Sequence, residues 1–290
     1  MLVAFSNDKR SLPAWVAERE MSPFTCPECG KEVVLHKGQL RVHHFKHKPP
    51  ITCPYGSGET DEHYVAKKEL YESLSGHPNI AKFEIEYRGL AGARPDVYFE
   101  TKAPTCRVAI ELQKSSQKVE DVQRRTATYN QLGVHVIWIF PYKEPSWVDG
   151  ETGVCKVQSW HEYFHLMFFG RVYFWQSGRT VRAAHFGKFY RDTPSGNWVE
   201  DCEEKVGEDL SKTHWYQDNH SDAYYGGGRR LVKSFKEVKW AEKPLDLLDD
   251  FRATTRDKPF PTKRYTVPVC RIWVDRLQAW WPKEEFKKSF

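Results

Sequence analysis

The pattern of apolar and polar positions between residues 58 and 142 predicts a helix, three strands, a second helix and a fourth strand. The first segment opens with acidic and small polar residues and then repeats apolar residues at helical spacing. The last segment is a nearly continuous apolar run, which is typical of a strand covered on both faces. A strand, a crossover helix and a buried strand favour parallel pairing of the last two strands, so we expect a mixed sheet. In order, the segments are 59–74, 81–87, 97–99, 108–112, 116–133 and 134–140.

Two segments of the C-terminal half also show clear patterns. Residues 168–186 alternate aromatic and basic residues around Ser177 and Gly178, which predicts a hairpin. Such a stripe can stack on bases and pair with phosphates, as in proteins that bind single strands; the alternative is a strand pair that is half core and half solvated. The apolar positions of residues 272–281 suit a helix that docks on the protein and ends at Pro282.

Composition places these elements in an ordinary water-soluble chain. Of its 290 residues, 40% are hydrophobic and 29% charged, and no apolar run approaches the roughly 18 residues that a membrane helix needs. The first ten residues lack the basic and then apolar order of a secretory signal, so we expect a cytoplasmic protein without membrane contact. The net charge of +5 permits an anionic partner such as nucleic acid without requiring one.

A short N-terminal segment carries metal-ligating residues at close spacing. Cys26-Pro-Glu-Cys29 forms a knuckle ahead of a hairpin predicted at residues 32–42, and histidines and a further cysteine follow. Zinc needs four such ligands, and an odd total of seven cysteines suits a metal site better than disulfides. The alternative, surface histidines beside free cysteines, leaves unexplained how so short a segment poor in apolar residues folds. We therefore expect structural zinc in a module that contacts nucleic acid or protein; the sequence leaves open which four of Cys26, Cys29, His43, His44, His47 and Cys53 bind it.

Two carboxylates fall on the predicted neighbouring strands. Asp96 precedes Val97-Tyr-Phe, and Glu111 lies within Val108-Ala-Ile-Glu-Leu. Acidic groups brought together at strand ends repel each other unless a cation or a proton lies between them. The pair is therefore either a divalent-metal site or two exposed carboxylates at strand edges.

Several short motifs, taken together in their order and spacing, resemble the competence protein CoiA family. The resemblance covers residues 20–142, and the family in turn resembles the PD-(D/E)XK nuclease superfamily behind a small zinc-finger-like module. It implies a restriction-endonuclease-like mixed sheet flanked by helices and a zinc-ribbon-like N-terminal module. The resemblance fades after residue 142, and from its own residues we expect the rest of the chain to be an aromatic-rich C-terminal α+β extension. The motifs are Cys-x-x-Cys, His-Phe-x-His, Cys, Glu-Thr-Asp-Glu-His-x-x-x-Lys, Pro-Asp-Val, Ile-Glu-Leu-Gln-x-Ser, Arg-x-x-x-Tyr and Val-Ile-Trp-Ile. We expect the N-terminal module to span residues 1–57, the nuclease-like core 58–142 and the C-terminal region 143–290.

The resemblance also implies roles for individual residues. Asp96 and Glu111, with the carbonyl of Leu112, would hold Mg²⁺ or Mn²⁺, which neutralises an anionic phosphodiester and activates water. Gln113 stands where many superfamily members have lysine; it can orient water but supplies no positive charge. The residues left to supply that charge are Lys118 and Lys67, which lies on the helix that also carries Glu62 and His63 of the family motif. Three further residues, Lys114, Arg125 and Tyr129, are expected to contact nucleic acid. The alternative for Arg125 is that it packs on Tyr129 at a helix surface.

We therefore expect a Mg²⁺-dependent enzyme that hydrolyses DNA phosphodiester bonds. The first alternative is a nucleic-acid-binding accessory protein, without cleavage, that assists a recombinase during DNA uptake or repair. It is favoured if neither Lys67 nor Lys118 approaches the metal site. The second alternative is a protein-interaction module, which is favoured if Asp96 and Glu111 lie far apart.

Overall fold

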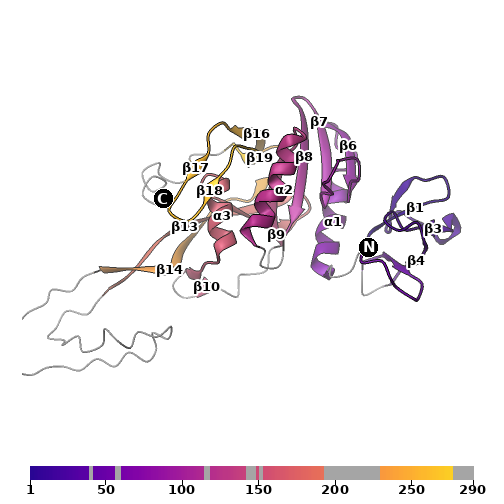
Figure 1. The fold of residues 1–290 in the computed structure, drawn as a ribbon, viewed down its shortest axis with the longest axis horizontal. Coiled ribbons are helices and arrows are strands. Elements are labelled where there is room, and N and C mark those ends of the chain that lie inside the picture. Colours follow the sequence, from indigo (N-terminus) through magenta and orange to yellow (C-terminus); the bar gives the residue numbers. More distant parts are fainter. Residues whose placement is uncertain are drawn as a thin grey trace, which may run out of the picture.

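A small antiparallel sheet forms the N-terminal end of the protein and packs beside the first helix (Figure 1). In the computed structural model, residues 1–38, 42–55, 60–113, 118–141, 148–149, 153–192 and 229–276 are described. The sheet has its own core, in which the rings of Phe24 and Phe45 lie 5.1 Å apart. Its strands follow the order β2-β1-β3-β4-β5, with β1 Val3–Phe5, β2 Ser11–Pro13, β3 Phe24–Thr25, β4 Glu32–His36 and β5 His44–His47, and with a short 3₁₀ helix at Arg19–Met21.

The hairpin of this module differs in detail from the prediction. Its first strand, β4, begins at Glu32 as expected and alternates buried and exposed residues. Its partner is β5, which contains the histidines themselves, and Val33 pairs with His47. The expected second strand at residues 40–42 falls mostly on residues 39–41, outside the described part. The histidine segment is therefore part of the sheet and not of a loop after it.

The central segment confirms the predicted order of elements. It contains α1 Asp61–Leu74, β6 Ile80–Ile85, β7 Val97–Lys102, β8 Thr105–Leu112, α2 Val119–Gln131 and β9 His135–Pro141. Strand β7 pairs antiparallel with both β6 and β8, whereas β8 and β9 pair in parallel, as the crossover helix predicts. Helix α1 packs on β6 and β9, and α2 packs on β9. The result is a mixed α/β fold.

The C-terminal half extends the same sheet. The boundary expected at residue 142 falls between β9 and β12, which pair in parallel through Tyr173 and Ile139. The sheet has twelve strands among the described residues. The remaining elements are β10 Val148–Asp149, β11 Val154–Lys156, α3 Ser159–Met167, β12 Val172–Ser177, β13 Thr180–Asp192, β14 Arg229–Trp240, β15 Leu245–Asp246, β16 Phe251–Arg256 and β19 Cys270–Asp275 in or on this sheet, and the separate pair β17 Phe260–Pro261 and β18 Thr266–Val267.

The predicted hairpin at residues 168–186 is confirmed as β12 and β13, which are joined at Ser177 and Gly178. The aromatic residues of β12 face the core: Tyr173, Phe174 and Trp175 are all less than 9% exposed. Because successive residues of a strand point to opposite faces, β12 is core on both faces and not half solvated, and its buried rings cannot stack on bases.

The helix predicted over residues 272–281 is wrong for its first residues. Ile272, Trp273 and Val274 belong to the buried strand β19, which pairs with β16 and touches β9. Branched and aromatic side chains fit a pleated surface better than a helix, and pairing with the neighbouring strands makes these residues extended. Residues 277–281 lie outside the described part. No described helix is both long and apolar enough to cross a membrane.

Candidate functional site

Asp96 and Glu111 face each other across two paired strands. The register of β7 and β8 pairs Val97 with Ile110, which places Asp96 directly before β7 beside Glu111 on β8. The backbone N–H of Leu112 donates to Asp96 Oδ2 over 2.9 Å. The Asp96 side chain is 23% exposed, whereas that of Glu111 is 1% exposed. The expected acidic pair is thus brought together at the ends of neighbouring strands, one carboxylate reaching solvent and the other buried.

The cation beside this pair comes from helix α1. The ammonium of Lys67 lies 2.8 Å from Asp96 Oδ1 and 3.0 Å from Glu86 Oε1, and its side chain is only 1% exposed. Burial alone would raise the pKa of Asp96, but the charge of Lys67 outweighs it and the pKa is lowered. The pKa of buried Glu86 is lowered in the same way, against its desolvation. Lys67 is therefore shared between two ionised carboxylates.

Glu111 is held from the other side by helix α2. Arg125 reaches Glu111 Oε2 over 2.5 Å, and the hydroxyl of Tyr129 donates to Oε1. Burial raises the pKa of Glu111 to about 7; Arg125 opposes this shift and the charge of Asp96 adds to it. The opposing cation thus leaves the carboxyl near the midpoint of its titration at neutral pH.

The nucleic-acid contact expected of Tyr129 does not fit this placement. Tyr129 is 1% exposed, so no face of its ring is open to a base. The Arg125 guanidinium stacks on the ring of Trp138 at 4.8 Å while it pairs with Glu111. Both residues therefore orient a carboxylate, which a sequence cannot distinguish from a phosphate contact because the residue types suit either role.

The other expected residues surround the pair at different depths. His63 Nε2 lies 3.0 Å from the carbonyl oxygen of Leu112. Gln113 is buried, and its backbone N–H donates to Ile139 over 2.8 Å. Glu62 is partly buried in the first turn of α1, and Lys118 is exposed just before α2. Lys114, and Glu59 at the predicted helix start, lie outside the described residues.

The donor atoms of the pair fit a divalent cation of the Mg²⁺ class. Asp96, Glu111 and the carbonyl of Leu112 offer oxygen ligands, which such hard cations prefer. Each carboxylate has lone pairs beyond those used by the protein donors. Burial is the main cause of the raised pKa of Glu111, and the neighbouring charge of Asp96 adds to it. A divalent cation at these oxygens would stabilise the ionised form of both carboxylates.

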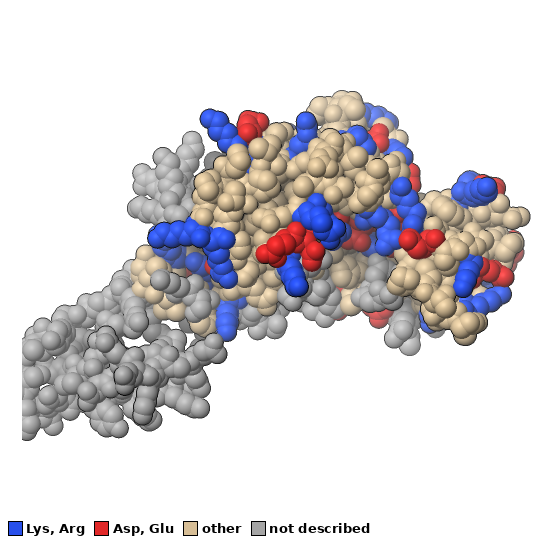
Figure 2. All heavy atoms as spheres, viewed as in Figure 1, with Lys and Arg blue, Asp and Glu red and all other residues tan. Residues whose placement is uncertain are grey.

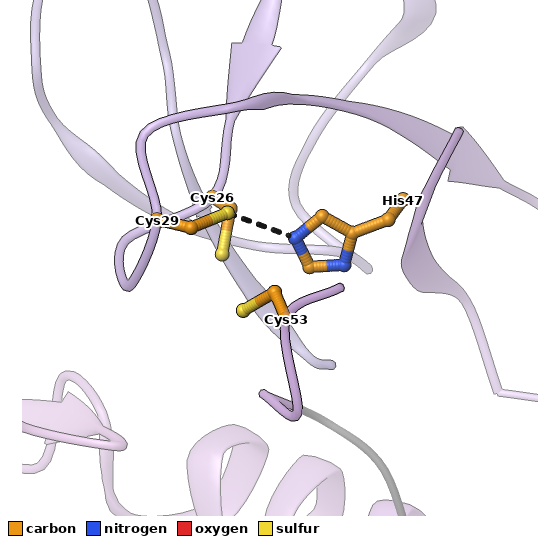
Figure 3. A group of neighbouring side chains, drawn as sticks. All are labelled: Cys26, Cys29, His47 and Cys53. Carbon is orange, nitrogen blue, oxygen red and sulfur yellow. Dashed lines mark hydrogen bonds between the residues drawn. The ribbon is translucent and has the colours of Figure 1, made fainter. Parts of the chain in front are cut away.

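A second candidate metal site lies in the N-terminal module. Among the described residues, Cys26, Cys29, His47 and Cys53 bring their ligand atoms within 4.8 Å of one another. The four side chains point toward a common centre, and Cys29 Sγ lies 3.3 Å from His47 Nε2 (Figure 3). Three sulfurs and one imidazole make a closed set of the kind that holds structural zinc. Burial raises the pKa of Cys26 to about 11, a cost that a bound metal ion would offset by stabilising the thiolate.

His44, also expected as a candidate ligand, lies outside this group. Its Nδ1 is 2.9 Å from the carbonyl oxygen of Val42, and its ring stacks between those of His36 and Tyr64. Alternation along β5 explains the difference, because neighbouring residues of a strand point to opposite faces and only one face carries His47. His43 does not belong to the group either.

Two residues near the pair were missed in the sequence: Glu86 and Tyr55. The alternation of residues 81–87 places Glu86 on the polar face of a strand, yet it is 6% exposed. Its φ of 53° breaks the extended backbone and redirects the side chain, which the sequence does not signal. The hydroxyl of Tyr55 donates to Glu86 Oε2. Tyr55 follows Cys53 by two residues, and only a spatial contact identifies its role.

Comparison with known proteins gives two matches in chain order. Residues 6–56 match the family model described as competence protein CoiA, N-terminal domain. Residues 59–175 match the family model described as competence protein CoiA, nuclease-like domain. The second match extends through β9 to β12 and so includes the strand that joins the C-terminal half to the sheet. Neither the curated proteins nor the solved structures contain a match to the chain.

Proposed function

The chain belongs to the competence protein CoiA family, and from this premise we propose that it is a Mg²⁺-dependent nuclease that hydrolyses phosphodiester bonds in DNA. The nuclease-like domain contains the acidic pair, Lys67 and the two residues of α2 that hold Glu111. Its order of helix, three antiparallel strands, helix and parallel strand supports a restriction-endonuclease-like core. A zinc ion at the cysteine and histidine group would stabilise the N-terminal module.

The observation that carries the proposal is the position of Lys67. Gln113 cannot supply the positive charge that lysine provides in many related nucleases, so another cation must reach the reacting phosphate. The Lys67 ammonium lies 2.8 Å from Asp96, where a bound phosphate would also approach. The accessory alternative gains if neither Lys67 nor Lys118 approaches the pair, so the position of Lys67 weighs against it.

Each residue of the site has a distinct part in the proposed reaction. Asp96, Glu111 and the Leu112 carbonyl would hold Mg²⁺ or Mn²⁺, which neutralises the phosphate and lowers the pKa of a bound water. Lys67 stabilises the negative charge that develops on the phosphate oxygens as water attacks. Gln113 orients the attacking water through its amide. Arg125 and Tyr129 fix the Glu111 carboxylate so that its oxygens need not reorganise during the reaction.

The test is cleavage of single-stranded, duplex and branched DNA in the presence of Mg²⁺ or Mn²⁺. We expect the wild type to cut at least one substrate and Glu111→Gln to lose cleavage while still binding DNA. Glu120→Gln, at an exposed site on α2, is the matched control and should cut normally. If the wild type binds DNA with the salt dependence of phosphate contacts but cuts none of the substrates, the accessory function replaces the nuclease.

A further inference from the structure

Two arginines of the central α/β segment form ion pairs with the Cys26–Cys29 knuckle of the N-terminal module. Glu28, between Cys26 and Cys29, accepts from Arg88 over 2.7 Å and from Arg94 over 3.3 Å. Both guanidinium groups stack on the ring of Tyr55, each 4.8 Å from its centre. Figure 2 shows acidic and basic side chains gathered where the N-terminal module meets the core. The knuckle therefore contacts the core through charged groups and not through apolar packing alone.

Tyr55 continues this connection toward the acidic pair. It is 7% exposed, and its hydroxyl donates to Glu86 Oε2. The other oxygen of Glu86 lies 3.0 Å from Lys67, which lies 2.8 Å from Asp96. Every link of the path from the knuckle to Asp96 is a hydrogen bond, an ion pair or a ring contact between neighbouring groups.

Glu86 adopts a backbone conformation that side chains rarely take. Its φ is 53°, and the residue is neither glycine nor at the tip of an exposed turn. A conformation of this kind is unfavourable by itself and persists when the surrounding structure fixes it. Here Tyr55 and Lys67 fix the two carboxylate oxygens, which is an arrangement typical of a positioning residue.

From these contacts we infer that Glu86 is a positioning residue that holds Lys67 beside the acidic pair, and that metal binding at the knuckle controls it through Tyr55. A divalent cation at Asp96 repels the Lys67 ammonium by like charge. Glu86 is the counter-charge that receives the ammonium and keeps it within reach of the phosphate. The knuckle metal, by fixing Cys53 and with it Tyr55, sets the position of Glu86. The two metal sites are then coupled, although no ligand is shared.

The coupling can be measured as Mn²⁺ affinity by calorimetry, in the full chain and without DNA. Glu86→Gln removes the counter-charge, so Lys67 stays on Asp96 and competes with Mn²⁺; we expect binding about tenfold weaker, with zinc retained. Glu84→Gln, on strand β6 two residues before Glu86 and paired with Lys82, is the matched control and should bind Mn²⁺ like the wild type. Circular dichroism and zinc content confirm that each variant is folded.

The link to the knuckle is tested by removing zinc with a chelator and restoring it. Coupling between two sites typically changes affinity 5- to 150-fold; we expect zinc removal to weaken Mn²⁺ binding about tenfold in the wild type and zinc addition to restore it. Tyr55→Phe keeps the ring contacts but lacks the hydroxyl, so in this variant Mn²⁺ affinity should no longer respond to zinc. Equal responses in both proteins, or an unchanged Mn²⁺ affinity in Glu86→Gln, would overturn the inference.

This inference rests on the proposed metal site at Asp96 and Glu111, but the experiments distinguish a failure of the coupling from a failure of the nuclease function. A wild type that binds Mn²⁺ in a zinc-dependent way and cuts no DNA supports the coupling and removes the nuclease function. A wild type that cuts DNA, with Mn²⁺ affinity independent of zinc, keeps the nuclease function and removes the coupling.

Discussion

Lys67 on helix α1 forms an ion pair with Asp96, which directly precedes strand β7, at a distance of 2.8 Å. A helix therefore brings a cation to the acidic pair, where Gln113, directly after β8, carries no positive charge. The pair is surrounded by charge on both sides, since Arg125 holds Glu111 and Lys67 holds Asp96. Because each carboxylate has its own cationic partner, the contributions of Asp96 and Glu111 can be measured independently.

Lys67→Met is expected to reduce DNA cleavage by about 10²–10³-fold, the range for loss of one donor that stabilises transition-state charge. Without metal, it should also lower the free energy of unfolding by about 3–5 kcal/mol, because Asp96 and Glu86 are left without their shared cation. Mn²⁺ should bind more tightly, since no ammonium competes for Asp96. Cleavage rates and chemical unfolding measure these effects.

The neighbouring residue Lys68 provides the control for this experiment. Its side chain is 37% exposed and pairs with Glu72 along the helix, so Lys68→Met should change the free energy of unfolding by less than about 1 kcal/mol and leave cleavage intact. Cleavage near the wild-type rate in Lys67→Met would show that the charge at this position takes no part in the reaction.

Divalent-metal affinity should depend on pH through Glu111. Its pKa of about 7 lies above the ordinary value of 4.5, so between these values the metal-free folded protein holds a proton that the unfolded chain lacks. This contribution stabilises the metal-free fold as pH falls from 7 to 4.5. Metal binding requires the ionised form, so affinity should rise about tenfold per unit up to pH 7 and then level off.

Calorimetric titrations with Mn²⁺ at pH 6, 7 and 8 measure this dependence. Tyr129→Phe removes a hydroxyl that stabilises the Glu111 carboxylate, so the levelling should move to higher pH. Glu111→Gln should abolish both tight binding and its pH dependence. Equal Mn²⁺ affinity at pH 6 and 8 in the wild type would contradict the assignment of Glu111 as a ligand.

Regular periodicity predicted the central elements, because local pattern and tertiary structure agree there. The order from α1 to β9 follows from apolar spacing, and the parallel pair β8 and β9 follows from the crossover helix. The approach of Asp96 to Glu111 followed from placing both on neighbouring strands. These inferences need only residues close in sequence or one pairing step.

Contacts that depend on a single backbone angle or on distant pairing could not be predicted. The inward turn of Glu86 depends on its positive φ, and its partner Tyr55 comes from another module. Strand β19 resembled a docked helix because short apolar runs fit either structure, and its pairing with β16 decided the outcome. Tyr129 and Arg125 were identified as important, but only the structure directs them to Glu111.

The zinc site can be tested with two histidines of the same strand. His47→Asn should lose the metal and unfold the N-terminal module, whereas His44→Asn should retain one zinc per chain, because only His47 lies within the group. Metal content after dialysis and the fluorescence change on adding a chelator measure the difference. Loss of zinc from both variants to the same extent would contradict the ligand set.

Acid should destabilise the fold through buried histidines beneath the C-terminal half of the sheet. Burial lowers the pKa of His161 to about 3 and that of His165 well below 6.5, so both are neutral in the folded protein. As pH falls below 6.5 the unfolded chain takes up protons that the folded protein does not, and for His161 stability falls by about 1.4 kcal/mol per pH unit. Between pH 7 and pH 5 the loss through His161 should be about 2 kcal/mol, and His165 acts in the same direction.

Urea unfolding at pH 7 and pH 5, followed by tryptophan fluorescence, measures this loss. His161→Gln cannot be protonated and suits the first turn of α3, where His161 Nδ1 accepts from the Gln158 backbone. We expect this variant to lose about 2 kcal/mol less than the wild type between the two pH values, whatever its stability at pH 7. An equal loss of stability in both proteins would contradict the prediction, because it would mean that protonation of His161 contributes nothing to unfolding in acid.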